Sequence, residues 1–498
     1  MMKKTALLIF ITALFHMVAS VYIFAEDMPG KKASSPILQT PSQIEHFLRL
    51  DQMYPFSHHE MFLETAKDVL DKNVRELRLK DAVDLGIENH LLSKLATEKV
   101  DEALGKRLQS LSKLLPDVQS SVYQRRTFKE NLDAQGLKGY GVIGPFNTFD
   151  GRIQLMQKVL DLTALSNFQA GIRDVHAARY ETEFVRQKVV LLVSLDYLEA
   201  LRSQGDFKAA EANVTLSLKL LKQAKDQFQA GLANNVDVAR AETRLAQDEF
   251  RLARLRTDVH EAYLELQRAT GLPYEGLVRL MNSLGFIREN VPELADALVL
   301  AKQNRLDIKV SQERLEAGQY RLQGAKMKLL PQLELFGDYG SSGNEWNKKD
   351  HMTESIMLQA TMPVFDGGKI FGEIKESDSQ KKQLQIYDDD LRRQVEEDVQ
   401  KSLWLMDTVM DQVLAASRVV GLAWHELELA QDRFSKGIGD NVELINAQTS
   451  LEDARDQYVI ALTQYHAARI NLYFALGQTD TFYLLDVINK DSVKKKEA

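Results

Sequence analysis

The sequence predicts a mainly α-helical fold with additional membrane β-structure, arranged as two tandem repeats. Three observations along the 498 residues predict it: a long internal duplication, short segments in which polar and apolar residues alternate, and long proline-free segments followed by seven-residue repeats. Only 10 residues are proline and 26 are glycine, whereas 27% are charged and 44% are hydrophobic. This balance is typical of long helices with charged surfaces.

The N-terminus has the pattern of a secretory signal peptide. Two lysines precede an apolar run over residues 6–24, and an acidic pair follows. We expect a signal peptide over residues 1–25, with cleavage after Ser20 or Ala25. Because the apolar run is long for a signal, an uncleaved membrane anchor is the alternative. Beyond it, no stretch of about 18 apolar residues occurs, so a membrane location would have to do without transmembrane helices.

The duplication appears when the chain is aligned with itself. Residues 79–116 match residues 294–331 at an offset of 215, and residues 228–271 match residues 434–477 at an offset of 206. The change of offset falls in the polar stretch 127–148, where a loop absorbs extra length at little cost. We therefore expect two copies of one unit.

Each copy contains two segments with the side-chain period of a β-strand. In the clearest of them, polar side chains alternate with apolar ones such as Ile153 and Leu155; the polar residues are Asp150, Arg152, Gln154 and Lys158. About 9–11 residues suffice to cross a bilayer as a tilted strand. The four expected strands cover residues 117–125, 149–160, 332–340 and 354–365.

Each pair of strands is followed by a long helical hairpin. Residues 162–230 and 367–436 contain no proline, and a helix of about 70 residues would be about 100 Å long. Both segments end at a glycine-containing turn, which is a helix stop signal. In the return segments, apolar residues and alanines recur every seven residues, as in a coiled coil, and Asp248 alone breaks the first row.

Amphipathic strands of this number cannot lie in lipid as an open sheet, because the two edges would expose unpaired N–H and C=O groups. Four strands are also too few to close a barrel, so several chains must contribute to one. The polar faces would then line a wet lumen and the apolar faces would meet lipid. The long helices must project from the barrel on the side of the strand–helix junctions.

Several local motifs are similar to those of the TolC family of outer-membrane efflux proteins, over about residues 79–477. The family's Pro-Leu-Phe-Asp-Gly-Gly junction corresponds to Pro-Val-Phe-Asp-Gly-Gly at residues 363–368. Its post-turn pattern corresponds to Asn-Val-Asp-Val at 235–238 and Asn-Val-Glu-Leu at 441–444. The first junction, residues 158–162, departs from the pattern because it lacks both proline and the glycine pair.

The resemblance implies a non-enzymatic, passive exit duct in the cell outer membrane. It implies a homotrimer with a shared transmembrane β-barrel of four strands per protomer and a periplasmic α-barrel of helical hairpins. Its partners would be a periplasmic adaptor (membrane fusion protein), an inner-membrane pump and outer-membrane lipid, in a tripartite efflux or type I secretion system. The implied segments are a signal peptide (1–25), an N-terminal periplasmic extension (26–78), the first repeat (79–271), an equatorial linker (272–292), the second repeat (293–477) and a C-terminal tail (478–498).

The resemblance also implies an entrance at the inner end of the tunnel, where family members carry a ring of acidic side chains just after the second turn. The matching positions are Glu443 and Asn446, with Asp440 in the turn and Asp237 as the first-repeat counterpart of Glu443. Three copies of Glu443 around one axis would favour cations. Asn446 departs from the acidic pattern. Alternatively, Glu443 and Asp237 serve only the electrostatics of a first helical turn.

Other functions have less support. A net charge of −8 disfavours a nucleic-acid partner, and the absence of cysteine excludes disulfides and thiolate metal sites. The glycine spacing at 139–144 lacks the strand and helix of a dinucleotide site, and the His58-His59-Glu60 cluster lacks metal-site spacing, so no cofactor or metal is expected. A periplasmic adaptor would carry one hairpin rather than two, and a purely structural coiled coil would leave the alternating strands unexplained.

Overall fold

The computed structural model describes residues 74–129, 143–231, 233–274, 277–286, 288–346, 351–436, 438–439 and 441–479. The expected signal peptide, nearly all of the N-terminal extension and nearly all of the C-terminal tail lie outside these residues. The chain divides into two units, residues 1–72 and 73–498, and the second is the one described below.

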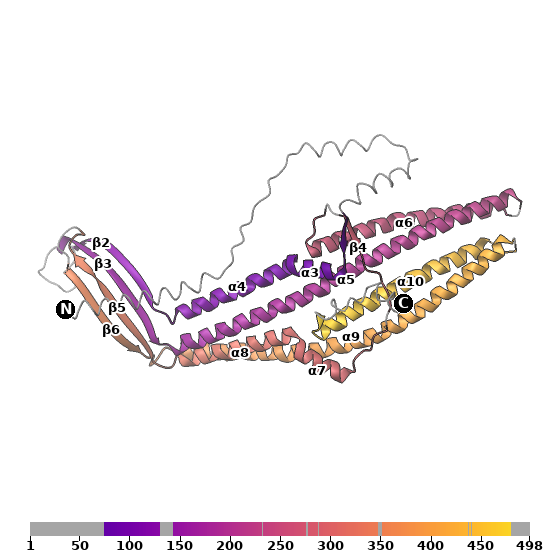
Figure 1. Ribbon diagram of the computed structural model, residues 1–498. Helices are drawn as coiled ribbons and strands as arrows, with labels where there is room; N and C mark the ends of the chain where they lie inside the picture. Colours follow the sequence, from indigo (N-terminus) through magenta and orange to yellow (C-terminus); the bar gives the residue numbers. More distant parts are fainter. Residues whose placement is uncertain are drawn as a thin grey trace, which may run out of the picture. The chain divides into compact units, whose positions relative to one another are not determined.

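The two repeats have the same order of elements: two short helices, two strands, one long helix and one return helix (Figure 1). The first repeat comprises α3 (Leu79–Asn89), α4 (Leu91–Ser112), β2 (Asp117–Lys129), β3 (Ile143–Leu160), α5 (Leu162–Gln229) and α6 (Asn235–Thr270). The second comprises α7 (Leu294–Asn304), α8 (Leu306–Met327), β5 (Gln332–Gly343), β6 (His351–Thr361), α9 (Lys369–Ser435) and α10 (Asn441–Ala475).

The predicted strands form one four-stranded antiparallel sheet in the order β2-β3-β5-β6. The strands differ from expectation at their ends: β3 begins at Ile143 rather than 149, and β6 ends at Thr361 rather than 365. β6 stops early because Pro363 has no N–H to donate to a ladder, and Gly367 and Gly368 then adopt left-handed backbone with φ of 70° and 89°.

One face of the sheet is mainly polar and the other mainly apolar, as the alternation predicts. On β3 and β5, Gln154 lies opposite Asp338 and Lys158 opposite Glu334 on the polar face. The other face carries apolar side chains that are largely exposed in the single chain, including Ile153, Ile356 and Leu358. Among the described residues, no helix is both long and apolar enough to span a membrane.

The long helices α5 and α9 contain 68 and 67 residues, about 100 Å each. Asp161 starts α5 as an N-cap, its carboxylate accepting a 2.8 Å hydrogen bond from the N–H of Ala164. α5 packs against α4, α6, α8 and α10, whereas α9 packs against α7, α8 and α10 (Figure 1). The helices next to the sheet therefore follow the order α4-α5-α8-α9, in step with the strands.

The linker between the repeats contains a strand that the sequence did not predict. Leu277–Leu280 (β4) pairs in parallel with Val74–Leu77 (β1). Both Leu77 and Leu280 are buried in one apolar cluster with residues of α5. The hydroxyl of Tyr197 on α5 lies 2.9 Å from the Leu77 carbonyl oxygen, so the small sheet is fastened to the long helix.

Candidate entrance and lumen sites

The first hairpin turn holds Asp237 in a capping box. Its backbone N–H donates to the Asn234 side chain at 3.0 Å, and the Asn234 N–H donates back to the Asp237 carboxylate at 3.1 Å. Arg240 lies 3.7 Å from the same carboxylate. Asp237 is therefore the third residue of α6 and part of the cap that begins this helix.

The second turn places Glu443 in the first turn of α10. Its carboxylate lies 3.3 Å from the Arg433 Nε on α9, and both side chains are about half exposed. Asn446, one turn further along α10, is also exposed. Asp440 lies outside the described residues.

Two hydrogen bonds join the ends of the two hairpins. The amide of Asn441 donates to the Asp237 carbonyl oxygen at 2.8 Å, and the amide of Gln227 donates to the Phe434 carbonyl oxygen at 3.0 Å. Phe434 and Leu444 are buried in a cluster of apolar residues directly behind the turns. The predicted residues Asp237 and Glu443 are thus brought to the same end of the molecule, through their neighbours rather than by direct contact.

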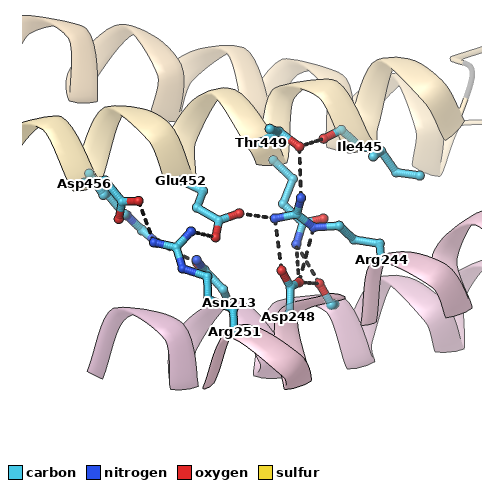
Figure 2. Close-up of polar contacts among 11 residues, drawn as sticks. Asn213, Arg244, Asp248, Arg251, Ile445, Thr449, Glu452 and Asp456 are labelled. Carbon is cyan, nitrogen blue, oxygen red and sulfur yellow. Dashed lines mark hydrogen bonds and ion pairs between the residues drawn. The ribbon is translucent and has the colours of Figure 1, made fainter. Parts of the chain in front are cut away.

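A buried ion network lies further along the return helices (Figure 2). Glu452 on α10 accepts from both Arg244 and Arg251 on α6. Arg244 also lies 3.1 Å from Asp248, and Arg251 lies 2.5 Å from Asp456. Glu452 and Asp248 are only 6% and 3% exposed. The network therefore joins the return helix of one repeat to that of the other.

The network accounts for the interruption in the heptad row. The Asp248 carboxylate accepts from the hydroxyl of Ser217 on α5, and Gln448 on α10 donates to the same hydroxyl at 2.6 Å. Burial lowers the pKa of Arg251, but its hydrogen bonds to Asp456 and Glu452 outweigh this and raise the pKa overall. Sequence reasoning detected Asp248 as an anomaly but missed its partners.

On the polar face of the sheet, Arg152 is held between two carboxylates. It donates to Asp150 of its own strand and, at 2.9 Å, to Asp338 of β5. Ser342 donates to Asp150 at 2.8 Å. Gly340 lies opposite Arg152, and a side chain there would meet the Arg152 Cβ at 2.5 Å. The contact thus requires glycine.

The other two predicted residues of this face make fewer contacts. Lys158 lies 3.1 Å from Asp161 and 4.0 Å from Glu334, at the point where the strand passes into the helix. Gln154 is exposed between them and Arg152. All four predicted residues share one face of β3, and the carboxylates of β5 neutralise part of their charge.

This combination of a duplicated pair of amphipathic strands and a duplicated helical hairpin defines an outer-membrane channel protein. The family model of the outer membrane efflux protein matches residues 144–272 and 297–478. The chain belongs to the outer membrane efflux protein family. It is an outer-membrane channel of efflux or type I secretion systems and not an enzyme, and the predicted family, fold class and location are confirmed.

Known proteins of this kind resemble the chain over most of its length. Outer membrane protein TolC of Salmonella enteritidis is 24% identical over 409 residues, covering 78% of this chain and 80% of the relative. Alkaline protease secretion protein AprF of Pseudomonas aeruginosa is 21% identical, covering 83% and 87%. The solved CmeC outer membrane channel of Campylobacter jejuni has the same fold, with a TM-score of 0.70, 17% identity and coverage of 91% and 94%.

Proposed function

We propose that three copies of this chain form one exit duct, which an inner-membrane pump and a periplasmic adaptor supply with cargo. The observation that carries the proposal is that, among the described residues, the outer strands β2 and β6 each have one edge without a strand partner. Every residue of β6 is exposed, although the strand belongs to a sheet with one apolar face. Open edges cannot persist in lipid, so β6 of one copy must pair with β2 of the next.

The helices next to the sheet also leave one exposed helix at each end of their row. α4 and α9 occupy the two ends of the helix order, just as β2 and β6 occupy the two ends of the sheet order. A contact between unlike surfaces, repeated from copy to copy, closes into a ring when the rotation fits. In such a ring, the polar face with Asp150, Arg152, Gln154 and Lys158 lines the lumen.

The entrance of the proposed duct lies at the hairpin turns. Glu443 is an exposed acid there, and three copies around the axis would attract cations. Asp237 contributes by fixing the turn through its capping box, and Asn446 lies exposed one turn further along α10. Asp440 is assigned to the entrance from the sequence alone. Contact of an adaptor with the turns would draw the hairpins of neighbouring copies apart, with the energy supplied by the pump because a passive duct has no energy source of its own.

Cargo selection is proposed to reside in the pump. Relatives of similar identity have names that refer to very different cargo: alkaline protease secretion, pyoverdine export and solvent efflux. A channel architecture shared by a protein, a siderophore and organic solvents offers little discrimination by itself.

The trimer is tested by the native mass of protein extracted in detergent from outer membranes, where a monomer would refute the proposal.

The entrance is tested by single-channel conductance and ion selectivity of Glu443→Gln in planar bilayers. Asp453→Asn, which neutralises an exposed acid on the same helix, is the matched control. We expect a weaker preference for cations in Glu443→Gln only. Equal conductance and ion selectivity in the two variants would show that Glu443 does not act at the entrance.

A further inference from the structure

The internal repeat relates contacts within the chain to contacts that one chain cannot make. The shift of 206 residues superposes α5 on α9 and α6 on α10 without a gap in the sequence. Within the chain, α5 of the first repeat packs against α10 of the second. By the same relation, α9 of the second repeat should meet α6 of a first repeat that follows it, and that repeat belongs to another copy.

Two apolar residues of one buried cluster illustrate this relation. Leu198 on α5 and Ile470 on α10 are 3% and 2% exposed and share one buried cluster. Their counterparts 206 residues away are Trp404 on α9 and Leu264 on α6. These two side chains are also apolar, yet they are 71% and 48% exposed in the single chain.

A second pair changes its chemistry but stays complementary. Phe184 on α5 and Phe474 on α10 pack with ring centroids 6.0 Å apart. Their counterparts are Asp390 on α9 and Arg268 on α6, which are both exposed. An aromatic pair within the chain thus corresponds to a pair of opposite charges between copies.

Lipid is not a suitable occupant of this surface. Trp404 lies 35 residues into α9, about 50 Å from the end of the helix that adjoins the sheet. The hydrocarbon core of a bilayer is only about 30 Å thick. An exposed tryptophan and a matching exposed leucine this far from the bilayer therefore require a protein partner.

We propose that α9 of one copy packs against α6 of the next, with Trp404 against Leu264 and Asp390 against Arg268. This inference rests on the proposed trimer and adds the residues that join its helices. The contact uses different surfaces on the two copies, so each copy presents α9 to one neighbour and α6 to the other. A buried tryptophan beside a charge pair at the rim is the usual composition of a strong protein contact.

The test uses disulfide cross-linking, because the natural chain contains no cysteine. Full-length Trp404→Cys and Leu264→Cys variants carrying different tags are produced together and oxidised with copper phenanthroline in isolated outer membranes. We expect a covalent dimer that carries both tags. Two single variants on separate chains exclude a bond formed within one chain.

The matched control pairs Leu264→Cys with Trp424→Cys. Trp424 is an exposed tryptophan on the same helix, 20 residues or about 30 Å further along. Equal yields for the two pairs, or no mixed dimer from a protein whose native mass is still trimeric, would overturn the proposed contact. A monomeric native mass would instead refute the trimer itself.

The charge pair gives an independent result. Asp390→Arg and Arg268→Asp, each alone, should lower the fraction of trimer surviving mild detergent challenge by several fold, because like charges then face each other. The double variant Asp390→Arg/Arg268→Asp should restore most of it. A double variant no better than either single variant would show that these two residues do not meet.

Discussion

Replacing Glu452 with glutamine should loosen the two return helices from each other. Glu452 is the anion that both Arg244 and Arg251 contact, and its side chain is only 7% exposed. Removing one partner of a buried ion pair costs about 3–5 kcal/mol, because the opposite charge stays behind without compensation. Arg244 keeps Asp248 and Arg251 keeps the more exposed Asp456, so we expect the lower end, about 3 kcal/mol.

Hydrogen exchange followed by mass spectrometry measures this loss locally, without requiring reversible unfolding of a membrane protein. A loss of about 3 kcal/mol corresponds to exchange roughly 100-fold faster in peptides covering the middle of α6 and the first half of α10. Asp453→Asn is the control, because it removes the same charge from the adjacent, exposed position. Equal exchange in Glu452→Gln and Asp453→Asn would refute the view that the network holds the hairpins together.

Two further predictions concern pH and packing. Burial lowers the pKa of His466 to about 4 in the folded chain, so the unfolded chain binds a proton at this residue more readily. The free energy of unfolding should therefore fall by up to about 3 kcal/mol as the pH drops from about 6.5 to about 4. His466→Gln should flatten this dependence of the thermal midpoint, and the exposed His425→Gln should leave it unchanged. Gly340→Ala should destabilise the sheet by about 1–3 kcal/mol because its Cβ would meet Arg152 at 2.5 Å. The control is Gly337→Ala, in which the atoms nearest to the new Cβ lie 3.9 Å away, an ordinary van der Waals distance. This variant should unfold at nearly the same temperature as the natural protein.

The repetitive parts of the fold could be predicted because their signals are local. Alternation over a dozen residues indicates a strand with two unlike faces, and a heptad row indicates a packed helix, whatever lies elsewhere in the chain. The cap at Asp237 is local too, since its partner Asn234 is three residues away. These features depend on spacing along one element, which the sequence displays directly.

The remaining features depend on residues far apart in the sequence. β1 pairs with β4 about 200 residues later, and four residues with a weak pattern contain no sign of that partner. Asp248 stands out as a charge in an apolar row, but its partners Ser217 and Gln448 are 31 and 200 residues away. Choosing them requires knowing how the two hairpins pack.

The residues of the ion network have no charged counterparts in the other repeat. Shifted by 206 residues, the positions of Arg244, Asp248, Arg251, Glu452 and Asp456 become Ser450, Ala454, Gln457, Ala246 and Phe250, none of which is charged. Within a chain, the two return helices are therefore joined by buried ions. The equivalent contact between copies would contain only uncharged side chains.

Separating the hairpins of one chain would leave several buried charges without partners, whereas separating neighbouring copies at the same level would not. We therefore expect the entrance to open between copies, with the two hairpins of each chain moving together. The double variant Arg244→Cys/Glu452→Cys lacks the network, so its own export before cross-linking is the reference. Joining the two cysteines with a short thiol cross-linker should then leave export by the pump assembly at the level of this reference. The control is the single variant Arg244→Cys treated with the same linker. Export that stops in the cross-linked double variant but continues in this control would show instead that the two hairpins of one chain must separate.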